Sequence, residues 1–427
     1  MLADRSSRDF LRQTSCREAR RGHLRSLRGT GRSQPLHSPV LAQTRPAVRV
    51  LWIVDSLVCK AGTEQQMLEL GRLIDSSGVD VRLATFESTQ PDYVLDVFPH
   101  PVAFPLERIW APGGIRQLWR LAGYLRAERI DIVHCFMVKS GIAGVVAGAL
   151  AGTPVVLTSR RDLGYYYTPN WLKIVRLLNR GVTRLTANCE AAKRVAAEAE
   201  GFDPSRIDVL YNGVDITRFR PRSEVPEAAD DSGGPALPAG CRVVGIVANY
   251  REVKDLPLFI RAAALLATQV PDAVFLLVGQ GTLQPELEEL AASLGLGGRI
   301  FFTGGVGSVP SLLRRMTIAC LSSHSEGFSN SVLEYMATEL PVVAMDVGGV
   351  GEAVVDGRTG LLIRERTPEA FAAGLLTLLK DPELAASMGR AGLEDCRGRF
   401  SLPVAVRVLE TYYRGLKRTE VTARFCR

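Results

Sequence analysis

Two glutamates late in the chain have a spacing that suits ligand binding. Glu326 lies in a loop after an apolar run, and Glu334 lies inside the helix that the pattern predicts from 329–331. The unpaired N–H groups of a helix N-terminus carry about half a positive charge, so a phosphate over residues 327–330 would need no basic side chain. Both carboxylates could then border one pocket and accept hydrogen bonds from sugar hydroxyls on either side of a diphosphate.

A structural interpretation of the same residues stays open on spacing alone. Ser331 and Glu334 also fit a capping box, in which the glutamate would bond a backbone N–H, and Glu326 would be a solvated loop residue. Glutamates at such a spacing are more often structural than ligand-binding, so the rest of the chain has to decide between the two interpretations.

The elements that would position these residues follow a regular alternation. From Val48 onward, short apolar runs alternate with longer segments of helical periodicity, which is typical of parallel sheets joined by crossover helices. A helix is expected from Thr63, with Gln66 as its capping-box partner, and further helices over 116–127 and 172–178. Strands are expected at 48–54, 81–86, 130–135, 155–158, 184–187, 207–210, 243–247, 274–278, 300–302, 318–321, 342–344 and 361–363.

A stretch rich in Pro and Gly interrupts this alternation at 220–241 and reads as a linker. The two series of strands around it predict an α/β protein with two doubly wound, Rossmann-like domains that face each other across a cleft. A ligand is expected near the C-terminal ends of the strands. The expected domains are 48–219 and 242–400, followed by a helix at 401–418 that packs back toward the first domain.

The net charge of +7 lies in the first 48 residues, which hold ten arginines against three acidic residues. The rest of the chain is neutral, which argues against a nucleic-acid-binding face on a folded domain. Residues 1–47 show no periodicity and are expected to form a disordered basic tail. Their Arg- and Ser-rich composition also resembles a transit peptide, a basic arm could touch anionic lipid, and the true start could lie nearer Val48.

The eight cysteines contain no C-x-x-C pair, so neither a zinc site of the usual spacing nor a disulfide framework is indicated. A reducing, cytoplasmic compartment fits this usage best. The most apolar stretch, 142–157, is too short and too interrupted to span a bilayer.

The segment 322–354 resembles the second-domain signature of the retaining glycosyltransferases of family 4 (glycosyl transferases group 1), which have the two-domain GT-B architecture. The match is E-G-F-S-N-S-V-L-E, followed by the family-like G-x-P-V-V-A-x-x-x-G-G-x-x-E, in which Leu340 replaces the usual Gly and Glu352 ends the motif. Further matches are Y-N-G-V-D at 211–215, G-Q-G at 279–281 and F-T-G at 302–304. The resemblance extends from Val48 to about Leu416.

This resemblance implies roles for the candidate residues of the second domain. Glu326 would contact the donor sugar and Glu334 the nucleotide ribose, and a lysine and an arginine would contact the diphosphate. Lys254 stands where the family's lysine is expected; the usual Arg position holds Asn249, so the arginine role goes to Arg251. The alternative for both cations is that they are solvated loop charges. The residues expected near the diphosphate are Gly327, Phe328, Ser329 and Asn330.

The first domain would hold the acceptor and close over the donor. Ala61-Gly62-Thr63 resembles the family's glycine loop, although an ordinary strand-to-helix turn explains it equally well. His134 ends a strand at a family-like position, yet a lone His there is more often structural. Where many members place another His, this chain has Ser159-Arg160-Arg161-Asp162, so Arg160 or Arg161 could bind an acidic group or pair with the aspartate.

The implied reaction is hexosyl transfer from a nucleotide-diphosphate sugar to a glycan or lipid-linked acceptor, as in the synthesis of surface polysaccharide or glycolipid. Arg251, Lys254 and the helix N-terminus would stabilise the departing diphosphate, and the family implies retention of configuration. No two aspartates stand two residues apart, so no metal and no cofactor is expected. The expected location is cytoplasmic, with peripheral contact at the inner face of the membrane and no nucleic-acid partner.

Two other classes of protein have features in common with this sequence. A non-catalytic two-domain sugar-binding protein of the periplasmic type would share the paired sheets, but it needs export, and the tail shows no signal sequence. A nicotinamide dehydrogenase would need a third Gly after Gly279-Gln280-Gly281, and Gln284 stands at that position.

Overall fold

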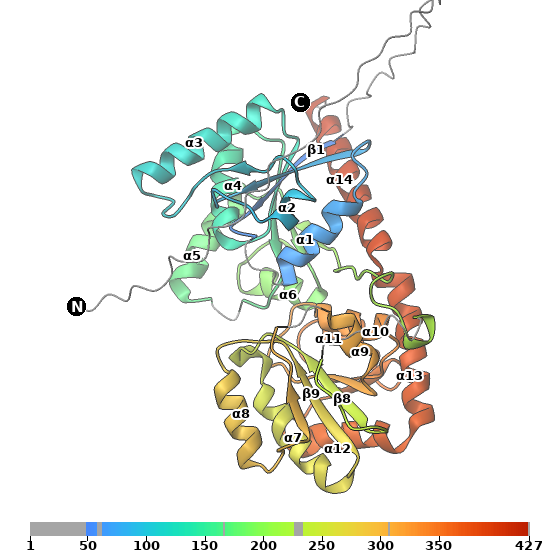
Figure 1. Ribbon diagram of the computed structural model, residues 1–427. Helices are drawn as coiled ribbons and strands as arrows, with labels where there is room; N and C mark the ends of the chain where they lie inside the picture. Colours follow the sequence, from blue (N-terminus) through green and yellow to red (C-terminus); the bar gives the residue numbers. More distant parts are fainter. Residues whose placement is uncertain (1–47, 58–61, 165–166, 226–233, 306–307, 426–427) are drawn as a thin grey trace, which may run out of the picture. The chain divides into compact units, whose positions relative to one another are not determined.

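The apolar runs of the first half form one parallel sheet (Figure 1). The structure, a computed structural model, describes residues 48–57, 62–164, 167–225, 234–305 and 308–425, and the statements below concern these residues. The predicted tail, Ala61 of the predicted glycine loop and 226–233 of the predicted linker lie outside them. The strands, in the sheet order β3-β2-β1-β4-β5-β6-β7, are β1 (Val48–Val54), β2 (Val79–Thr85), β3 (Val102–Ala103), β4 (Ile132–Cys135), β5 (Val155–Arg160), β6 (Arg184–Ala187) and β7 (Ile207–Val209).

The second half repeats this arrangement, and together the sheets confirm the predicted α/β class with two Rossmann-like domains. All strand pairings in the second sheet are parallel as well. In the sheet order β10-β9-β8-β11-β12-β13, its strands are β8 (Arg242–Val247), β9 (Ala273–Val278), β10 (Ile300–Phe302), β11 (Ile318–Leu321), β12 (Val342–Met345) and β13 (Gly360–Ile363).

Helices connect the strands, as parallel pairing requires. Those of the first half are α1 (Gly62–Leu73), α2 (Asp92–Leu95), α3 (Pro112–Ala127), α4 (Val138–Ala151), α5 (Pro169–Leu178) and α6 (Glu190–Glu198). Those of the second half are α7 (Leu256–Gln269), α8 (Gln284–Ser293), α9 (Val309–Arg314), α10 (Asn330–Ala337), α11 (Val350–Ala353), α12 (Pro368–Lys380), α13 (Pro382–Asp395) and α14 (Leu402–Phe425).

Successive side chains of β1 enter two separate cores, because neighbouring residues of a strand point to opposite faces of the sheet. Trp52 packs with Met67 of α1 and Tyr413 of α14 on one face. Leu51 packs with Leu121 of α3 on the other. A strand covered on both faces is apolar throughout, which is why the sequence shows continuous runs rather than alternation.

The expected strands are confirmed to within two residues at each end, and only the two-residue β3 was not predicted. The capping box proposed for Thr63 and Gln66 is wrong. Instead, the Gln66 amide donates to the Gly213 carbonyl at 2.6 Å and accepts from its N–H at 2.9 Å. A side-chain amide has the same donor and acceptor pair as a peptide group, so Gln66 fixes the loop after β7 against α1.

The apolar stretch 142–157 divides between the end of α4 and the start of β5. Across the described ranges, no helix is both long and apolar enough to cross a bilayer.

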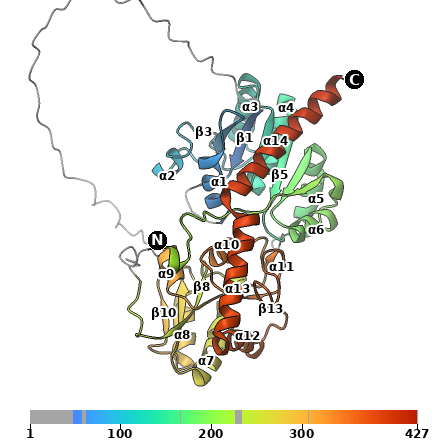
Figure 2. The ribbon, with the colours of Figure 1, turned by 90° about the vertical axis from the view of Figure 1, so that its right-hand side faces the viewer.

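The C-terminal helix α14 continues beyond its predicted end at 418 and lies against α1 and the first sheet (Figure 2). A short parallel bridge between Val214 and Ser401 precedes it. Within the helix, the Tyr413 hydroxyl accepts from Trp52 Nε1 at 2.8 Å and lies 2.7 Å from His134 Nδ1. Helix α14 is therefore built into the core of the first sheet through Leu409 and Tyr413.

Candidate functional site

One cleft of about 720 Å³ is lined by residues from both sheets. The second sheet contributes the loops after β8, β9 and β11 and the first turn of α10. The first sheet contributes the first turn of α1 and the residues that follow β5, β6 and β7. These are all carboxyl ends of parallel strands or helix N-termini, where doubly wound folds bind ligands.

Lys254 and Glu326 form the charged centre of this cleft. Lys254 Nζ lies 2.6 Å from Glu326 Oε1, and Ser323 Oγ donates to the same oxygen at 2.6 Å. Both side chains are largely buried, at 23% and 11% exposure. The ammonium has three donors and the carboxylate two acceptor oxygens, so each retains capacity for a ligand while it holds the other in place.

The N-terminus of α10 opens onto the same cleft. Ser329 is its N-cap and makes no side-chain capping bond, so the capping box of Ser331 with Glu334 is wrong. Gly327, Phe328, Ser329 and Asn330 all line the cleft. The backbone at Gly327 lies so close to the Arg161 carbonyl that a Cβ could not be accommodated there. An anion at this turn would meet backbone N–H groups and the positive end of the helix.

Glu334 lines the cleft from inside α10. Burial, with a smaller contribution from the carboxylate of Glu69, raises the pKa of Glu334 to about 8. A carboxyl group held near its titration point can accept a hydrogen bond from a hydroxyl or donate one to an oxygen.

A chain of side-chain hydrogen bonds crosses the cleft between the two sheets. The Arg161 guanidinium donates to Asn212 Oδ1 at 2.6 Å, and Asn212 Nδ2 donates to Asn330 Oδ1 at 2.6 Å. Asn330 Nδ2 then donates to the Gly62 carbonyl at 3.0 Å. The network joins the predicted donor residue Asn330 to the predicted closure residue Gly62.

The two predicted cations occupy different environments. Lys254 lines the cleft, and so does Asn249, the residue at the family's usual Arg position. Arg251 is exposed and is not among the described residues that line the cleft. Its charge acts on Glu64 of α1, where it lowers a carboxyl pKa that burial raises. Of the two cations, the geometry brings only Lys254 to Glu326.

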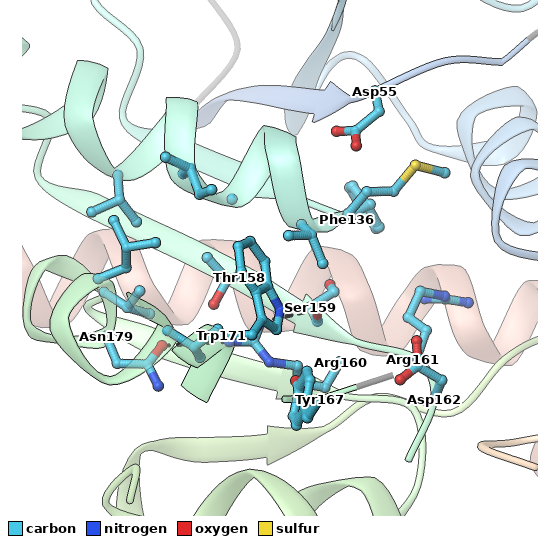
Figure 3. Close-up of a pocket in the computed structure, with 18 of the residues that line it drawn as sticks. Asp55, Phe136, Thr158, Ser159, Arg160, Arg161, Asp162, Tyr167, Trp171 and Asn179 are labelled. Carbon is cyan, nitrogen blue, oxygen red and sulfur yellow. Dashed lines mark hydrogen bonds between the residues drawn. The ribbon is translucent and has the colours of Figure 1, made fainter. Parts of the chain in front are cut away.

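A second pocket of about 310 Å³ lies in the first half, between α4, α5 and the end of β5 (Figure 3). It shares Thr63, Met137 and Arg161 with the cleft. Much of its wall is apolar, and Trp171 of α5 lies at its centre in the close-up. The Thr158 hydroxyl in this wall is buried and has no hydrogen-bond partner in the described chain. Its other apolar lining includes Phe136, Ile142, Val145, Val175, Leu178 and Val182.

Arg160 lines this second pocket, but its guanidinium is already paired with a carboxylate. Its guanidinium makes two bonds to Glu200, at 2.6 and 2.7 Å, and Glu200 is 1% exposed. Tyr167 also donates to Glu200, at 2.6 Å. The predicted acceptor-side arginine is therefore held in a buried ion pair, and Arg161, the neighbour, is the arginine that reaches the cleft.

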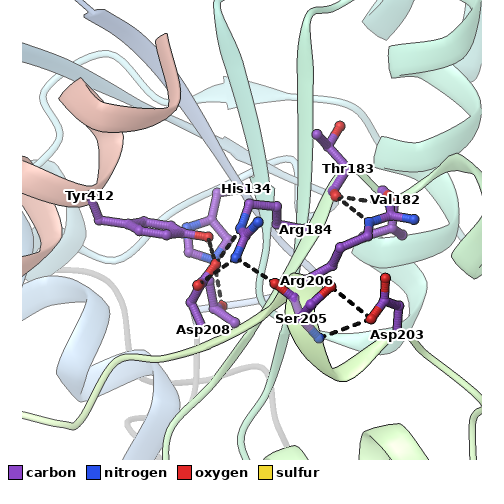
Figure 4. A network of polar contacts seen from close by, with 10 residues as sticks. His134, Val182, Thr183, Arg184, Asp203, Ser205, Arg206, Asp208 and Tyr412 are labelled. Atoms are coloured by element: carbon purple, nitrogen blue, oxygen red, sulfur yellow. Dashed lines mark hydrogen bonds and ion pairs between the residues drawn. The ribbon is translucent and has the colours of Figure 1, made fainter. Parts of the chain in front are cut away.

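His134 is buried and does not line the cleft; its Nε2 lies 2.8 Å from Ser159 Oγ. Burial lowers its pKa to about 3, so the ring is neutral. Separately, at the β6–β7 edge of the same sheet, Tyr412 of α14 donates to Asp208 at 2.8 Å, and Asp208 also pairs with Arg184 (Figure 4). The structural interpretation of His134 fits these contacts.

Two residues at the interface of the sheets were not assigned a role from the sequence. Glu352, the end of the second motif, accepts from the backbone N–H groups of Glu190 and Ala191 at 2.8 and 3.0 Å and from the Tyr211 hydroxyl at 3.0 Å. It thus binds the N-terminus of α6. Asn188 lines the cleft with a buried, unpartnered Oδ1. Its position directly after a predicted strand was the available signal.

No group of three or more His, Cys, Asp or Glu side chains that could hold a metal ion occurs in the described part of the chain. The expectation of a metal-independent reaction stays a prediction.

Two Rossmann-like sheets that share a cleft at their carboxyl ends have the arrangement of the GT-B architecture, which the sequence motifs imply. Comparison with known proteins agrees, because residues 61–218 match the model for Glycosyltransferase Family 4 and residues 230–395 match the model for Glycosyl transferases group 1. The chain belongs to glycosyltransferase family 4, as its motifs predicted. This membership favours a transferase over the sugar-binding and dehydrogenase alternatives.

Curated relatives that match most of this chain are also named as glycosyltransferases. A D-inositol 3-phosphate glycosyltransferase of Arthrobacter sp. is 31% identical over 314 residues, 67% of this chain and 70% of the relative. The enzyme of the same name from Thermobispora bispora is 29% identical over 84% of this chain and 91% of its own. An Escherichia coli UDP-Gal:alpha-D-GlcNAc-diphosphoundecaprenol alpha-1,3-galactosyltransferase is 26% identical over 76% and 86%.

Solved structures share the fold. A glycosyltransferase from Rickettsia africae superimposes with a TM-score of 0.75 at 19% identity, over 86% of this chain and 98% of its own. Anabaena HepE, solved with UDP and glucose, has a TM-score of 0.72 at 21% identity, over 86% and 99%.

Proposed function

We propose that this glycosyltransferase moves a hexose from a nucleotide-diphosphate sugar to a glycan or lipid-linked acceptor, with retention of configuration and without a metal ion. The observation that carries the proposal is the contact of Lys254 with Glu326 beside the N-terminus of α10, with Glu334 further along the same cleft. The ligands and substrates named for HepE and for the Escherichia coli relative support a nucleotide-sugar donor.

The cleft suits a donor that extends along α10. The diphosphate would lie over residues 327–330, where the helix N-terminus and Lys254 supply positive charge. Glu326 would then accept a hydrogen bond from the sugar, and Glu334 one from a ribose hydroxyl. In this position each carboxylate binds a hydroxyl and neither has to face the phosphates.

Transfer breaks the bond between the anomeric carbon and the phosphate oxygen, and the electron pair leaves with the diphosphate. The acceptor oxygen bonds to the anomeric carbon on the face that the diphosphate vacates, and its proton passes to the departing phosphate oxygen. The chain's task is to stabilise the leaving charge in a closed site. Removing one such donor typically raises a barrier by about 2.7 to 4 kcal/mol.

The pocket between α4 and α5 supports an acceptor with an apolar part. It joins the cleft at Thr63, Met137 and Arg161, so an acceptor held there could present a hydroxyl to the sugar. The unpartnered Thr158 hydroxyl gives this wall one polar contact. The synthesis of a surface polysaccharide or glycolipid in the cytoplasm, with peripheral contact at the membrane, fits such an acceptor.

The proposal is tested with the purified chain and a panel of UDP-, GDP- and ADP-hexoses. A bound donor raises the melting temperature, since ligand at 100 times its Kd adds about 2.7 kcal/mol of stability. The donor that binds is then incubated with prenyl-diphosphate-linked sugars, with and without EDTA, and the product anomer is assigned by NMR. Retained configuration with full activity in EDTA is expected. An inverted product, or activity that returns only with a divalent cation, would contradict the mechanism.

A further inference from the structure

Arg366 joins two loops of the second half that lie far apart in the sequence. It stands between β13 and α12 and is not among the described residues that line the cleft. Its Nη1 donates to Asp255 Oδ2 at 2.9 Å and to the Ser322 carbonyl at 3.0 Å, and its Nη2 donates to the Ser323 carbonyl at 2.8 Å. Because a guanidinium holds its donors in a rigid planar fork, one side chain fixes the two loops relative to each other.

These two loops carry Lys254 and Glu326. Ser323 Oγ donates to Glu326 Oε1 at 2.6 Å, and Ser322 Oγ donates to the Lys254 carbonyl at 2.8 Å. Both serines are fully buried. The carboxylate that Arg366 binds belongs to the residue directly after Lys254. Arg366 therefore bonds the immediate neighbours of both members of the Lys254–Glu326 pair.

The backbone at Asp255 needs such a contact. Its φ of 45° and ψ of 47° lie in the left-handed region, which residues other than glycine adopt rarely and keep only where their surroundings hold them. Asp255 precedes α7 but makes no side-chain capping bond to it. Its carboxylate is instead 15% exposed against Arg366, with His324 Nε2 at 3.3 Å from the same oxygen. The contact with Arg366 thus fixes the turn from which the Lys254 side chain leaves.

We propose that Arg366 is a positioning residue for glycosyl transfer, which sets the Lys254 ammonium and the Glu326 carboxylate in the place that the donor requires. Lysine has a flexible four-carbon stem, so its charge is placed accurately only if its backbone is held. A shift of about 1 Å in a group that acts on the reaction can cost about 100-fold in rate. This inference rests on the roles proposed above for Lys254 and Glu326.

The first test compares Arg366→Ala with Arg364→Ala, which removes an arginine that is 71% exposed two residues earlier. The donor is the UDP-, GDP- or ADP-hexose that raises the melting temperature of the wild type, and the acceptor is a prenyl-diphosphate-linked sugar. In Arg366→Ala, kcat should fall about 10- to 100-fold while the KM for the acceptor stays within about twofold. Arg364→Ala should match the wild type. Wild-type kcat in Arg366→Ala would overturn the proposal.

The conservative variant Arg366→Lys tests the fork itself. An ammonium can still pair with Asp255, but it lacks the planar arrangement that reaches the Ser322 and Ser323 carbonyls together. Its kcat should lie between those of the wild type and Arg366→Ala. A kcat for Arg366→Lys as low as that of Arg366→Ala would mean that the pairing with Asp255 positions nothing, and the proposal would fail.

A double variant separates positioning from a general effect on folding. Because Arg366 acts through Lys254, its loss should matter less once the ammonium is gone. The fall in kcat caused by Arg366→Ala should be at least about threefold smaller in the Lys254→Ala background than in the wild type. Equal falls in the two backgrounds would show a role independent of Lys254 and would overturn the proposal.

Hydrogen exchange of the free full-length protein tests the inference without any substrate. The amide of His324 donates to the Val253 carbonyl at 2.8 Å, and that of Asp255 to the Glu252 carbonyl at 3.0 Å. In Arg366→Ala, both amides should exchange at least about tenfold faster, while those within α12 keep their rates. Unchanged exchange at these two amides, or an equal increase throughout the second half, would contradict the proposal.

The kinetic results also distinguish this inference from the proposed function. If Lys254→Ala and Glu326→Ala both keep the wild-type kcat, the proposed function fails and this inference fails with it. If both variants lose activity and Arg366→Ala does not, only the inference about Arg366 fails.

Discussion

The two sides of the cleft use their polar residues in different ways. On the side of the second sheet, Lys254, Glu326 and Glu334 all face the cavity. On the side of the first sheet, Arg160 is held by Glu200, and His134 lies between Tyr413 and Ser159. Two sheets of similar topology thus differ in how they use their charged groups, although Arg161 and Asn188 on the first side also line the cavity.

The difference indicates how each side recognises its substrate. The second sheet offers fixed charges and a helix N-terminus, which suit a diphosphate whose charge is the same for every sugar nucleotide. The first sheet offers an apolar pocket with Arg161 at its edge, which suits recognition by shape. Substitutions on the two sides should therefore affect different kinetic constants.

The largest effect is expected from Lys254. Lys254→Ala removes a charge that would stabilise the departing diphosphate, and we expect kcat to fall about 100-fold or more, the usual cost of one such donor. Glu326→Ala should have a similar effect, since it removes the proposed contact with the sugar and leaves Lys254 without its partner. Initial rates at saturating donor measure both.

Arg251→Ala tests whether a cation that is close to Lys254 in the sequence, but outside the cleft, contributes to catalysis. Because Arg251 lies outside the described lining of the cleft, its loss should cost at least about tenfold less than that of Lys254. Lys380→Ala, an exposed charge at the end of α12, controls for a general effect of net charge. An Arg251 variant as impaired as the Lys254 variant would restore the arginine role predicted from the sequence.

On the first-sheet side, Trp171→Ala should act on the acceptor. Loss of a large apolar side chain from the pocket wall should raise the KM for a lipid-linked acceptor about tenfold and leave the KM for the donor unchanged. Lys173→Ala, an exposed residue of the same helix, is the control. Equal effects on both KM values would show that the two sides do not act separately.

Glu334→Gln should lower donor affinity and raise stability. The amide keeps one acceptor oxygen, but its nitrogen cannot accept a hydrogen bond, so we expect a cost of about 1 kcal/mol, or roughly fivefold in the donor KM. Since burial raises the folded-state pKa from 4.5 to about 8, the wild type loses stability as pH rises through this interval. The variant has no such group, so its melting temperature should exceed that of the wild type most at pH 8 and above, and least near pH 4.5.

Thermal melts across this pH range measure whether the melting temperature of Glu334→Gln lies above or below that of the wild type. A variant that melts below the wild type at pH 8 would mean that the Glu334 carboxylate is stabilised in the folded protein.

The sequence was most informative for the residues that line the second-sheet side of the cleft. Glu326, Lys254 and residues 327–330 were placed correctly in the cleft because a helix N-terminus and the residues beside it are contiguous in the chain. The strands could be predicted equally well, because burial on both faces of the sheet leaves uninterrupted apolar runs in the sequence.

Contacts between distant segments could not be read in the same way. Gln66 pairs with Gly213 across 147 residues, and Arg160 with Glu200 across 40, and neither pair has a local pattern. Local capping rules therefore gave the wrong partner for Gln66. The sequence predicted a diphosphate contact for Arg251 because of its charge and its place near Lys254. Which of the two side chains enters the cleft depends on the short turn 252–254, and this turn has no clear sequence pattern.

The smallest effect on activity is expected at Tyr413, which is buried in the core of the first sheet and does not line the cleft. Its hydroxyl accepts from Trp52 Nε1, and it can donate to the Nδ1 of the neutral His134 ring. Tyr413→Phe leaves both groups buried without that partner, which should cost about 1 to 3 kcal/mol of unfolding free energy while kcat changes by less than about twofold.

Tyr412→Phe is the matched control, because that neighbouring hydroxyl bonds Asp208, which keeps its contact with Arg184. Denaturant unfolding should also show a pH effect in the wild type. His134 has a folded-state pKa of about 3 against 6.5, so the unfolded chain takes up a proton that the folded chain excludes, and stability falls as pH drops below about 6.5. A Tyr413 variant with normal stability but reduced kcat would instead place His134 and its partners in the catalytic machinery, and the distinction between the two sides would fail.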